Sequence, residues 1–166
     1  MIPWKSLLLD IMMKLWCDVV QALAGKTLVT AESCTGGGIG AALTAIPGSS
    51  AVYKGGVICY TNWVKEHVLG VPAELLREFG AVSAPVAQAM AEGARKLLQA
   101  DLAVSVTGLA GPGGDDYGNP VGTVFIGCSN NLRTVSRGYH FSGDRETVRQ
   151  AAISAALNLV LEISKE

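Results

Sequence analysis

The stretch Leu28-Val-Thr-Ala-Glu-Ser-Cys-Thr-Gly-Gly-Gly38 decides the fold of this chain, because a short apolar run ends there in hydroxyl side chains and three glycines. Beyond it, apolar residues recur at helical spacing, at Ile39, Ala42, Leu43 and Ile46. The stretch therefore predicts a strand that turns tightly into a helix. The first N–H groups of a helix lack partners within it and attract anions. Ser33 and Thr35 add hydroxyls there, and the glycines let a ligand approach the backbone. We predict the active site at this turn.

A purely structural interpretation of the same stretch stays open. Ser33 or Thr35 can simply cap the helix, while the glycines allow the helix to pack closely on the strand. The stretch lacks the lysine of a P-loop and the spacing of a Gly-x-Ser-x-Gly elbow. The glycines alone therefore identify neither site.

Composition bounds the class of protein. With 166 residues, 49% of them hydrophobic, and a net charge of −1, we expect one domain over residues 1–166 and no nucleic-acid partner. The four cysteines form no Cys-x-x-Cys pair, which favours free thiols and no metal site. The apolar start, residues 1–20, is broken by charges, unlike a signal peptide or a membrane span. We therefore expect a cytoplasmic, soluble protein without a cofactor.

The remaining pattern predicts a single three-layer α/β/α domain with a mixed sheet. The last two strands form a hairpin and so must be antiparallel. Helices are expected over residues 4–23, from the glycine turn to 45, from a cap at Thr61 or Asn62, over 72–79, from a cap at Ser83 and over 144–163. Strands are expected over 26–31, 52–60, 102–107, 121–128 and 132–141. We expect a bulge or a close backbone approach at Gly55-Gly56.

Three segments are predicted to meet at one edge of the sheet. The glycine turn follows Ala31, a second glycine-rich loop, residues 108–118, follows Thr107, and Tyr60 ends another strand. Ligands of α/β sheets bind beyond the carboxyl ends of the strands. One crevice should therefore collect residues from all three.

Lys65 is the candidate base. It follows Tyr60-Thr-Asn-Trp-Val, in what we expect to be the first turn of a helix. The helix dipole disfavours a cation there, and so does desolvation if the amine lies partly out of water. Both effects lower the pKa of the amine and make a neutral base available. Lysine can activate serine in place of a histidine triad. The alternative is an ordinary solvated lysine beside Glu66.

Other reactive side chains rank lower. Cys34 could be a nucleophile at a helix N-terminus, where thiolates are favoured, although cysteines are often simply buried. We place it behind Ser33. The two histidines, His67 and His140, are expected to be structural or surface residues.

Six motifs together carry a resemblance to a known family. They are Ala31-Glu-Ser-Cys-Thr-Gly-Gly37, Ile46-Pro-Gly-Ser-Ser50, Gly55-Gly-Val-Ile-Cys-Tyr-Thr-Asn62 with Lys65, Thr107-Gly-Leu-Ala-Gly-Pro-Gly-Gly114, Pro120-Val-Gly-Thr-Val124 and Phe141-Ser-Gly-Asp-Arg145. Over residues 10 to 163 the chain resembles the family of the CinA carboxy-terminal domain, which includes stand-alone nicotinamide mononucleotide deamidases. The resemblance implies hydrolysis of that nucleotide to nicotinate mononucleotide and ammonia, in pyridine nucleotide salvage, without metal or cofactor.

The resemblance also implies roles for residues. Ser33 resembles the nucleophile, Lys65 the base and Tyr60 the phenol that completes the site, with N–H groups of the glycine turn holding the oxyanion. Arginine suits phosphate, and Arg145 resembles the family's position for it. Arg149, one turn further on, is either a second phosphate ligand or a solvated residue. The expected substrate-binding residues are Thr35, Gly36, Gly37, Asn62, Thr107, Gly108, Gly111 and Arg145.

Alternatives of other classes stay open. A non-catalytic nucleotide-binding module would have the glycine loops without hydrolysis, and the family's historical name suggests an interaction domain in DNA uptake. Many family members carry an additional amino-terminal domain, whereas residues 1–10 here are an apolar segment for which the resemblance gives no role. The apolar faces of the first and last helices predict a homodimer.

Overall fold

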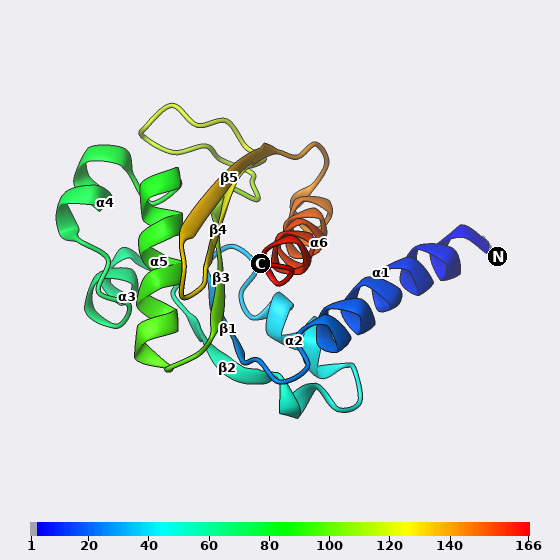
Figure 1. Cartoon of the computed structure of the whole chain (residues 1–166). Helices are drawn as coiled ribbons and strands as arrows, with labels where there is room; N and C mark the ends of the chain where they lie inside the picture. Colours follow the sequence, from blue (N-terminus) through cyan, green and yellow to red (C-terminus); the bar gives the residue numbers. More distant parts are fainter. Residues whose placement is uncertain (1–2) are drawn as a thin grey trace.

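The structure, a computed structural model, describes the backbone of residues 3–166 and the side chains from residue 7 onward. A five-stranded sheet lies between two layers of helices (Figure 1). Its strands are β1 (Leu28–Glu32), β2 (Tyr53–Ile58), β3 (Leu102–Gly108), β4 (Thr123–Ser129) and β5 (Thr134–His140). The helices are α1 (Pro3–Ala22), α2 (Gly38–Thr44), α3 (Asn62–His67), α4 (Ala73–Phe79), α5 (Ala84–Leu97) and α6 (Arg145–Ile163), with a 3-10 turn, η1 (Ser49–Ala51).

The sheet is mixed, as the sequence predicts. Its strand order is β2-β1-β3-β4-β5, with β1 parallel to both β2 and β3, and with antiparallel pairs β3–β4 and β4–β5. Glu32, the last residue of β1, pairs with Ile58 on one side and with Val106 on the other. The residues that follow these three strands therefore begin at the same edge of the sheet.

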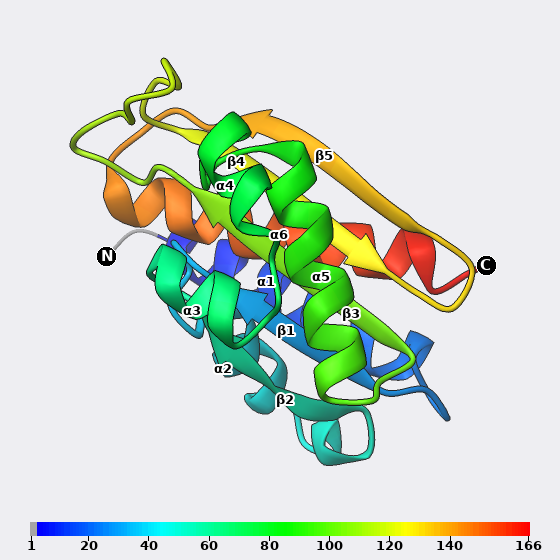
Figure 2. The same ribbon diagram turned by 90° about the vertical axis from the view of Figure 1, so that its left-hand side faces the viewer.

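Two hydrophobic cores hold the layers together. Helices α1, α2 and α6 cover one face of the sheet, while α3, α4 and α5 cover the other and stand in front of it in Figure 2. Strand β1 is buried along its whole length because it has neighbours on both edges and helices on both faces. The predicted three-layer α/β/α architecture is confirmed, and the type of every long element is as expected.

Local details differ from the expectation at one helix cap and agree with it at two other places. Ser83 precedes α5, but its hydroxyl donates to the carbonyl of Gly80 instead of capping the helix. Thr61 does cap α3, accepting from the N–H of Val64. The close approach expected at Gly55-Gly56 is present, because a Cβ on Gly56 would lie 2.0 Å from Oγ1 of Thr30.

The two terminal helices are covered to very different degrees. Val19 of α1 lies in the core, whereas the beginning of α1 projects from the body of the molecule (Figure 1) and exposes Leu7, Leu8, Leu9 and Ile11. The apolar face of α6 packs on the sheet of its own chain. The homodimer is predicted from the apolar faces of the first and last helices. Of these two faces, the structure leaves only that of α1 uncovered. Among the helices formed by residues 3–166, none combines the length and the apolar character needed to cross a membrane.

Candidate active site

Ser33 stands directly after β1, an inner strand of the sheet. Its N–H donates to the carbonyl of Val106 on β3 (2.9 Å), which continues the sheet pairing by one residue and fixes the start of the turn. The side chain is mostly buried yet lines a pocket. The strand-to-turn position predicted for the nucleophile is the observed one.

Lys65 reaches Ser33 from α3. Its Nζ lies 3.0 Å from Oγ of Ser33 and donates to the carbonyl of Cys59 (2.7 Å), with a longer contact to that of Tyr60 (3.5 Å). A neutral amine has two N–H groups and one lone pair. When the two carbonyls accept the N–H groups, the lone pair is left for the hydroxyl of Ser33. This is the arrangement that a general base requires.

Burial shifts the pKa of the Lys65 amine. Lys65 is only 1% exposed, and this loss of hydration lowers the pKa of its amine. The expected direction is therefore right, and of the two expected causes, the helix dipole and the loss of hydration, the second is the largest. The side chain leaves the six-residue helix α3 and ends among the atoms of Ser33 and Cys59, where its amine is desolvated.

The glycine turn is organised by Glu32, which the sequence did not mark as structural. Its carboxylate accepts from the hydroxyl of Thr35 (2.6 Å) and from the N–H groups of Gly37 (3.1 Å), Ile39 (3.0 Å) and Gly40 (3.0 Å). Glu32 is 1% exposed. The chain thus supplies its own anion to the first turn of α2, in the place where we expected an oxyanion from the substrate.

Three residues expected to contact substrate are consequently turned elsewhere. The hydroxyl and the side chain of Thr35 are buried against Glu32, and the N–H of Gly37 is already used. Gly36 and Gly37 both have positive φ angles, 58° and 98°, which explains why glycine stands there. None of the three lines the pocket that contains Ser33, so their role in the structure is to form the turn.

The other predicted site residues meet in one pocket of about 320 Å3. It lies beyond the carboxyl ends of β1, β2 and β3, and Ser33 and Lys65 are at its base. Residues Ala81 and Val82 also reach it, although no sequence signal pointed to the loop before α5. The lining residues are Ser33, Cys34, Tyr60, Asn62, Lys65, Ala81, Val82, Thr107, Gly108, Leu109, Ala110, Gly111, Gly113 and Arg145.

Arg145 and Tyr60 form the open side of this pocket. The Arg145 guanidinium donates to the carbonyl of Gly111 (2.6 Å) and lies 3.4 Å from the hydroxyl of Tyr60. Both side chains are exposed, so the cation at the pocket entrance stays accessible to an anionic ligand. Asn62, the first residue of α3, lines the same entrance.

Thr107 and the second glycine loop supply a further part of the pocket lining. Thr107 is buried, and its hydroxyl donates to the carbonyl of Ala81 (2.8 Å), which ties the loop to the segment before α5. A Cβ on Gly108 would lie 2.7 Å from a methyl group of Val124, so only glycine fits there beside β4. Gly111 lines the pocket with φ of 103°.

Cys34 shares the pocket with Ser33 but is poorly suited to act as the nucleophile. Burial raises the pKa of its thiol to about 11, so the thiolate is disfavoured at neutral pH. The helix N-terminus that should favour a thiolate is occupied by Glu32. The structure thus favours Ser33 over Cys34.

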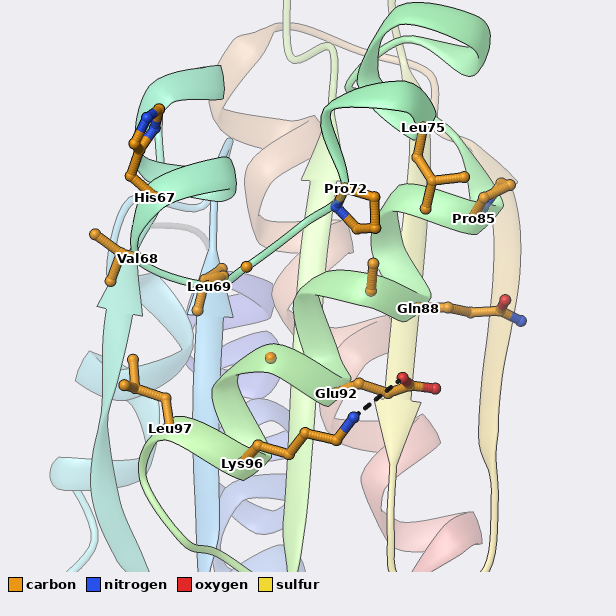
Figure 3. A pocket seen from close by; sticks show the side chains of 13 residues that line it. His67, Val68, Leu69, Pro72, Leu75, Pro85, Gln88, Glu92, Lys96 and Leu97 are labelled. Carbon is orange, nitrogen blue, oxygen red and sulfur yellow. Dashed lines mark ion pairs between the residues drawn. The ribbon is translucent and has the colours of Figure 1, made fainter.

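A larger hollow, of about 720 Å3, lies away from these residues on the outer side of α5 (Figure 3). It is bordered by Leu69, Pro72 and Leu75, with a Lys96–Glu92 ion pair at its edge. His67 borders it too, stacked on Trp63. No pair of a nucleophile and a base faces this hollow within the described residues, so size alone does not identify the active site here.

Comparison with curated proteins gives close relatives of greater length. The chain is 53% identical over 147 residues to a "CinA-like protein" of Parasynechococcus marenigrum, covering 85% of this chain and 35% of the relative. It is 52% identical over 134 residues to a "CinA-like protein" of Geobacter metallireducens, covering 81% of this chain and 32% of the relative. The chain therefore spans about a third of the length of these relatives.

Solved structures and a family model agree with this result. The crystal structure of the competence damage-inducible protein A (ComA) from Klebsiella pneumoniae has 40% sequence identity and a TM-score of 0.89, covering 91% of this chain and 95% of that one. That of a competence/damage inducible protein from Agrobacterium tumefaciens has 38% identity and a TM-score of 0.88, covering 93% and 96%. The model of the CinA C-terminal domain matches residues 13–164. The chain therefore belongs to the CinA C-terminal domain family.

Proposed function

We propose that this protein is an amidohydrolase that converts nicotinamide mononucleotide to nicotinate mononucleotide and ammonia. The observation that carries the proposal is the buried pair of Ser33 and Lys65, 3.0 Å apart at the base of a pocket. A buried lysine without a carboxylate partner destabilises the folded protein, because its charged form loses hydration. Such groups are characteristic of active sites. Binding alone gives no reason for an amine to lie against a serine hydroxyl.

The proposed reaction needs only these groups. Oγ of Ser33 attacks the carboxamide carbon, its proton passes to the neutral amine of Lys65, and the C=O electron pair moves onto oxygen. The tetrahedral intermediate then re-forms C=O and expels the amide nitrogen, which takes that proton and leaves as ammonia. Water, deprotonated by the same amine, attacks the ester and releases the carboxylate and Ser33.

The pocket suits a mononucleotide. Its volume of about 320 Å3 lies at the lower end of the range for small-ligand sites. Arg145, at the entrance, would pair with the phosphate, since a guanidinium binds phosphate oxygens in bidentate fashion. Asn62 and the loop from Thr107 to Gly113 would contact the ribose and the ring, and Tyr60 would hold Arg145 in position.

Incubation of the purified protein with nicotinamide mononucleotide, with ammonia and nicotinate mononucleotide as readouts, tests the proposal. We expect equal amounts of both products. Nicotinamide riboside, which lacks the phosphate, is the matched control and should react far more slowly. Calorimetric binding of the nucleotide without ammonia release would reject hydrolysis and favour the nucleotide-binding module.

A further inference from the structure

The turn that carries Ser33 is held from two opposite sides, by Glu32 and by Arg149. Glu32 engages the N–H groups of α2, whereas Arg149, on α6, engages carbonyl groups of the turn. We propose that Arg149 is a positioning residue, which fixes the peptide groups of residues 33–36 so that the N–H of Cys34 serves as the oxyanion donor. This rests on the proposed function, because an oxyanion forms only if Ser33 attacks a carbonyl.

The contacts of Arg149 define this role. Its Nε donates to the carbonyl of Cys34 (3.2 Å) and its Nη2 to that of Thr35 (3.2 Å), while Nη1 pairs with Glu146 (3.0 Å). Two consecutive carbonyls thus bind one planar guanidinium, whose N–H groups form a rigid fork that a lysine amine lacks. The alternatives of a phosphate ligand or a free solvated side chain do not fit these contacts.

The trans peptide groups transmit this constraint to the nucleophile. C=O and N–H point in opposite directions across a trans peptide, and the one cis bond recorded for residues 3–166 lies elsewhere, at Gly111–Pro112. With the carbonyl of Thr35 held by Arg149, the N–H of Gly36 points the other way and donates to the carbonyl of Ser33 (3.1 Å). Because this bond fixes the carbonyl of Ser33, the N–H of Cys34, on the other side of the same trans peptide, points away from the turn.

The N–H of Cys34 is in the right place to receive an oxyanion. Cys34 borders the pocket beside Ser33, and no other residue in the described part of the chain accepts from its N–H. The N–H of the residue after a nucleophile is a recurrent oxyanion donor in acyl transfer. The N–H groups of Gly37, Ile39 and Gly40, which the sequence suggested instead, are taken by Glu32.

Arg149 acts from outside the pocket. It borders a separate hollow with Trp16, Gln150 and Ile153, between α1, α2 and α6, and is absent from the lining of the Ser33 pocket. Arg145 lines the Ser33 pocket, whereas Arg149, one turn along α6, lies behind the turn. A residue in this position can affect turnover without touching the substrate.

The test compares Arg149→Met and Arg149→Lys with two controls. Glu146→Gln removes the ion pair but keeps the guanidinium, and Arg77→Met removes an exposed arginine paired at the same spacing, with Glu74. With nicotinamide mononucleotide as substrate, we expect Arg149→Met to lower kcat at least tenfold. This loss should be smaller than the roughly 100- to 1,000-fold loss that follows removal of an oxyanion donor itself. KM should change less than about threefold. Arg149→Lys should be intermediate and both controls near wild type.

A second readout does not depend on the nucleotide. A reactive phosphonofluoridate forms an Oγ–P bond on Ser33 and expels fluoride, with the serine proton passing to Lys65, and its rate is measured by the mass of the Ser33 peptide. Arg149→Met should slow this labelling, with a thermal unfolding midpoint close to that of wild type.

Each outcome decides between the two proposals. If the wild type releases ammonia, and Arg149→Met has the same kcat and the same labelling rate as the wild type, the positioning role is overturned and the proposed function stands. Slower labelling in Arg149→Met, with a wild type that releases no ammonia, would support positioning and reject the substrate. A wild-type Ser33 that is neither labelled nor active would overturn both. A kcat loss matched by an equal loss in Glu146→Gln would assign the effect to the ion pair and also overturn the positioning role.

Discussion

The amine of Lys65 lies 3.0 Å from the hydroxyl of Ser33, although the two residues are 32 positions apart in the chain. Strand β1 carries Ser33 to its carboxyl end, and β2, paired in parallel beside it, leads into α3 and Lys65. The pair therefore follows directly from the parallel alignment of two strands. Its chemistry follows from burial, since the lysine is dry and no carboxylate is paired with it in the described residues.

The pH dependence of turnover tests the base. Burial lowers the pKa of the Lys65 amine, so the neutral form becomes dominant at a lower pH than for a free lysine. With saturating nucleotide, kcat should rise with pH through one ionisation below the reference of about 10.4 and then level off. A rise centred at or above that reference would remove Lys65 as the base.

Two substitutions separate proton transfer from charge at the same position. Lys65→Arg should lose roughly 100- to 10,000-fold in kcat, because a guanidinium does not give up its proton. Lys65→Met should be as inactive, yet fold and bind the nucleotide, because an apolar chain of similar length suits this dry site. Substantial turnover by Lys65→Arg would reduce the lysine to an electrostatic anchor.

Much of this site could be predicted from the sequence, because it depends on local rules. A buried strand followed by Ser33 and glycines predicts a strand-to-helix turn, and parallel strands bring such turns together. Glu32 was out of reach, since a glutamate side chain at a strand end can point in several directions. The available signal was a carboxylate immediately before a glycine-rich helix start, where N–H groups need an acceptor.

Two further features depend on tertiary packing and have no local signature. Arg149 holds the turn only because α6 packs beside α2, a contact between segments more than 100 residues apart. The lowering of the Lys65 pKa depends on how completely Ser33, Cys59 and their neighbours exclude water from its amine. Helical spacing predicted the helix of Lys65 but not this burial.

Arg145 should contribute mainly to substrate binding. Loss of a charge-assisted contact to phosphate in Arg145→Met should raise KM for nicotinamide mononucleotide by about 10- to 100-fold, with a smaller change in kcat. The same substitution should leave the slow reaction of nicotinamide riboside unaffected, because that compound has no phosphate. Equal losses with both compounds would show that Arg145 serves the loop at Gly111 instead, to which it already donates.

Gly93 provides a test of packing in which helix propensity and sterics disagree. Alanine in a helix is normally favoured over glycine by about 1 kcal/mol. Here a Cβ would lie 2.0 Å from the carbonyl oxygen of Leu69, so Gly93→Ala should destabilise the fold by about 1–3 kcal/mol. Gly113→Ala, with nothing within 4 Å of the added Cβ, is the matched control for thermal unfolding. A stabilised Gly93→Ala would contradict this packing of α5 on Leu69.

We propose that the projecting beginning of α1 forms the interface of the predicted homodimer. Leu8 and Ile11 are both exposed and one helical turn apart, outside the residues that match the family model. Light scattering at micromolar concentration should give twice the 17.2 kDa of one chain. Leu8→Lys combined with Ile11→Lys should give the monomer with unchanged kcat. A monomeric wild type would reject the dimer.

The most direct test of the account is the rate of ammonia release from nicotinamide mononucleotide by Ser33→Ala, with Cys34→Ala measured in parallel. Both substitutions remove one small buried side-chain group from the same turn, so they should perturb packing to similar extents. We predict that Ser33→Ala binds the nucleotide without turnover, since its oxygen is the attacking atom, and that Cys34→Ala stays active. Removal of a nucleophile lowers turnover by several orders of magnitude. Ser33→Ala that retains more than about a tenth of wild-type turnover would therefore contradict the account.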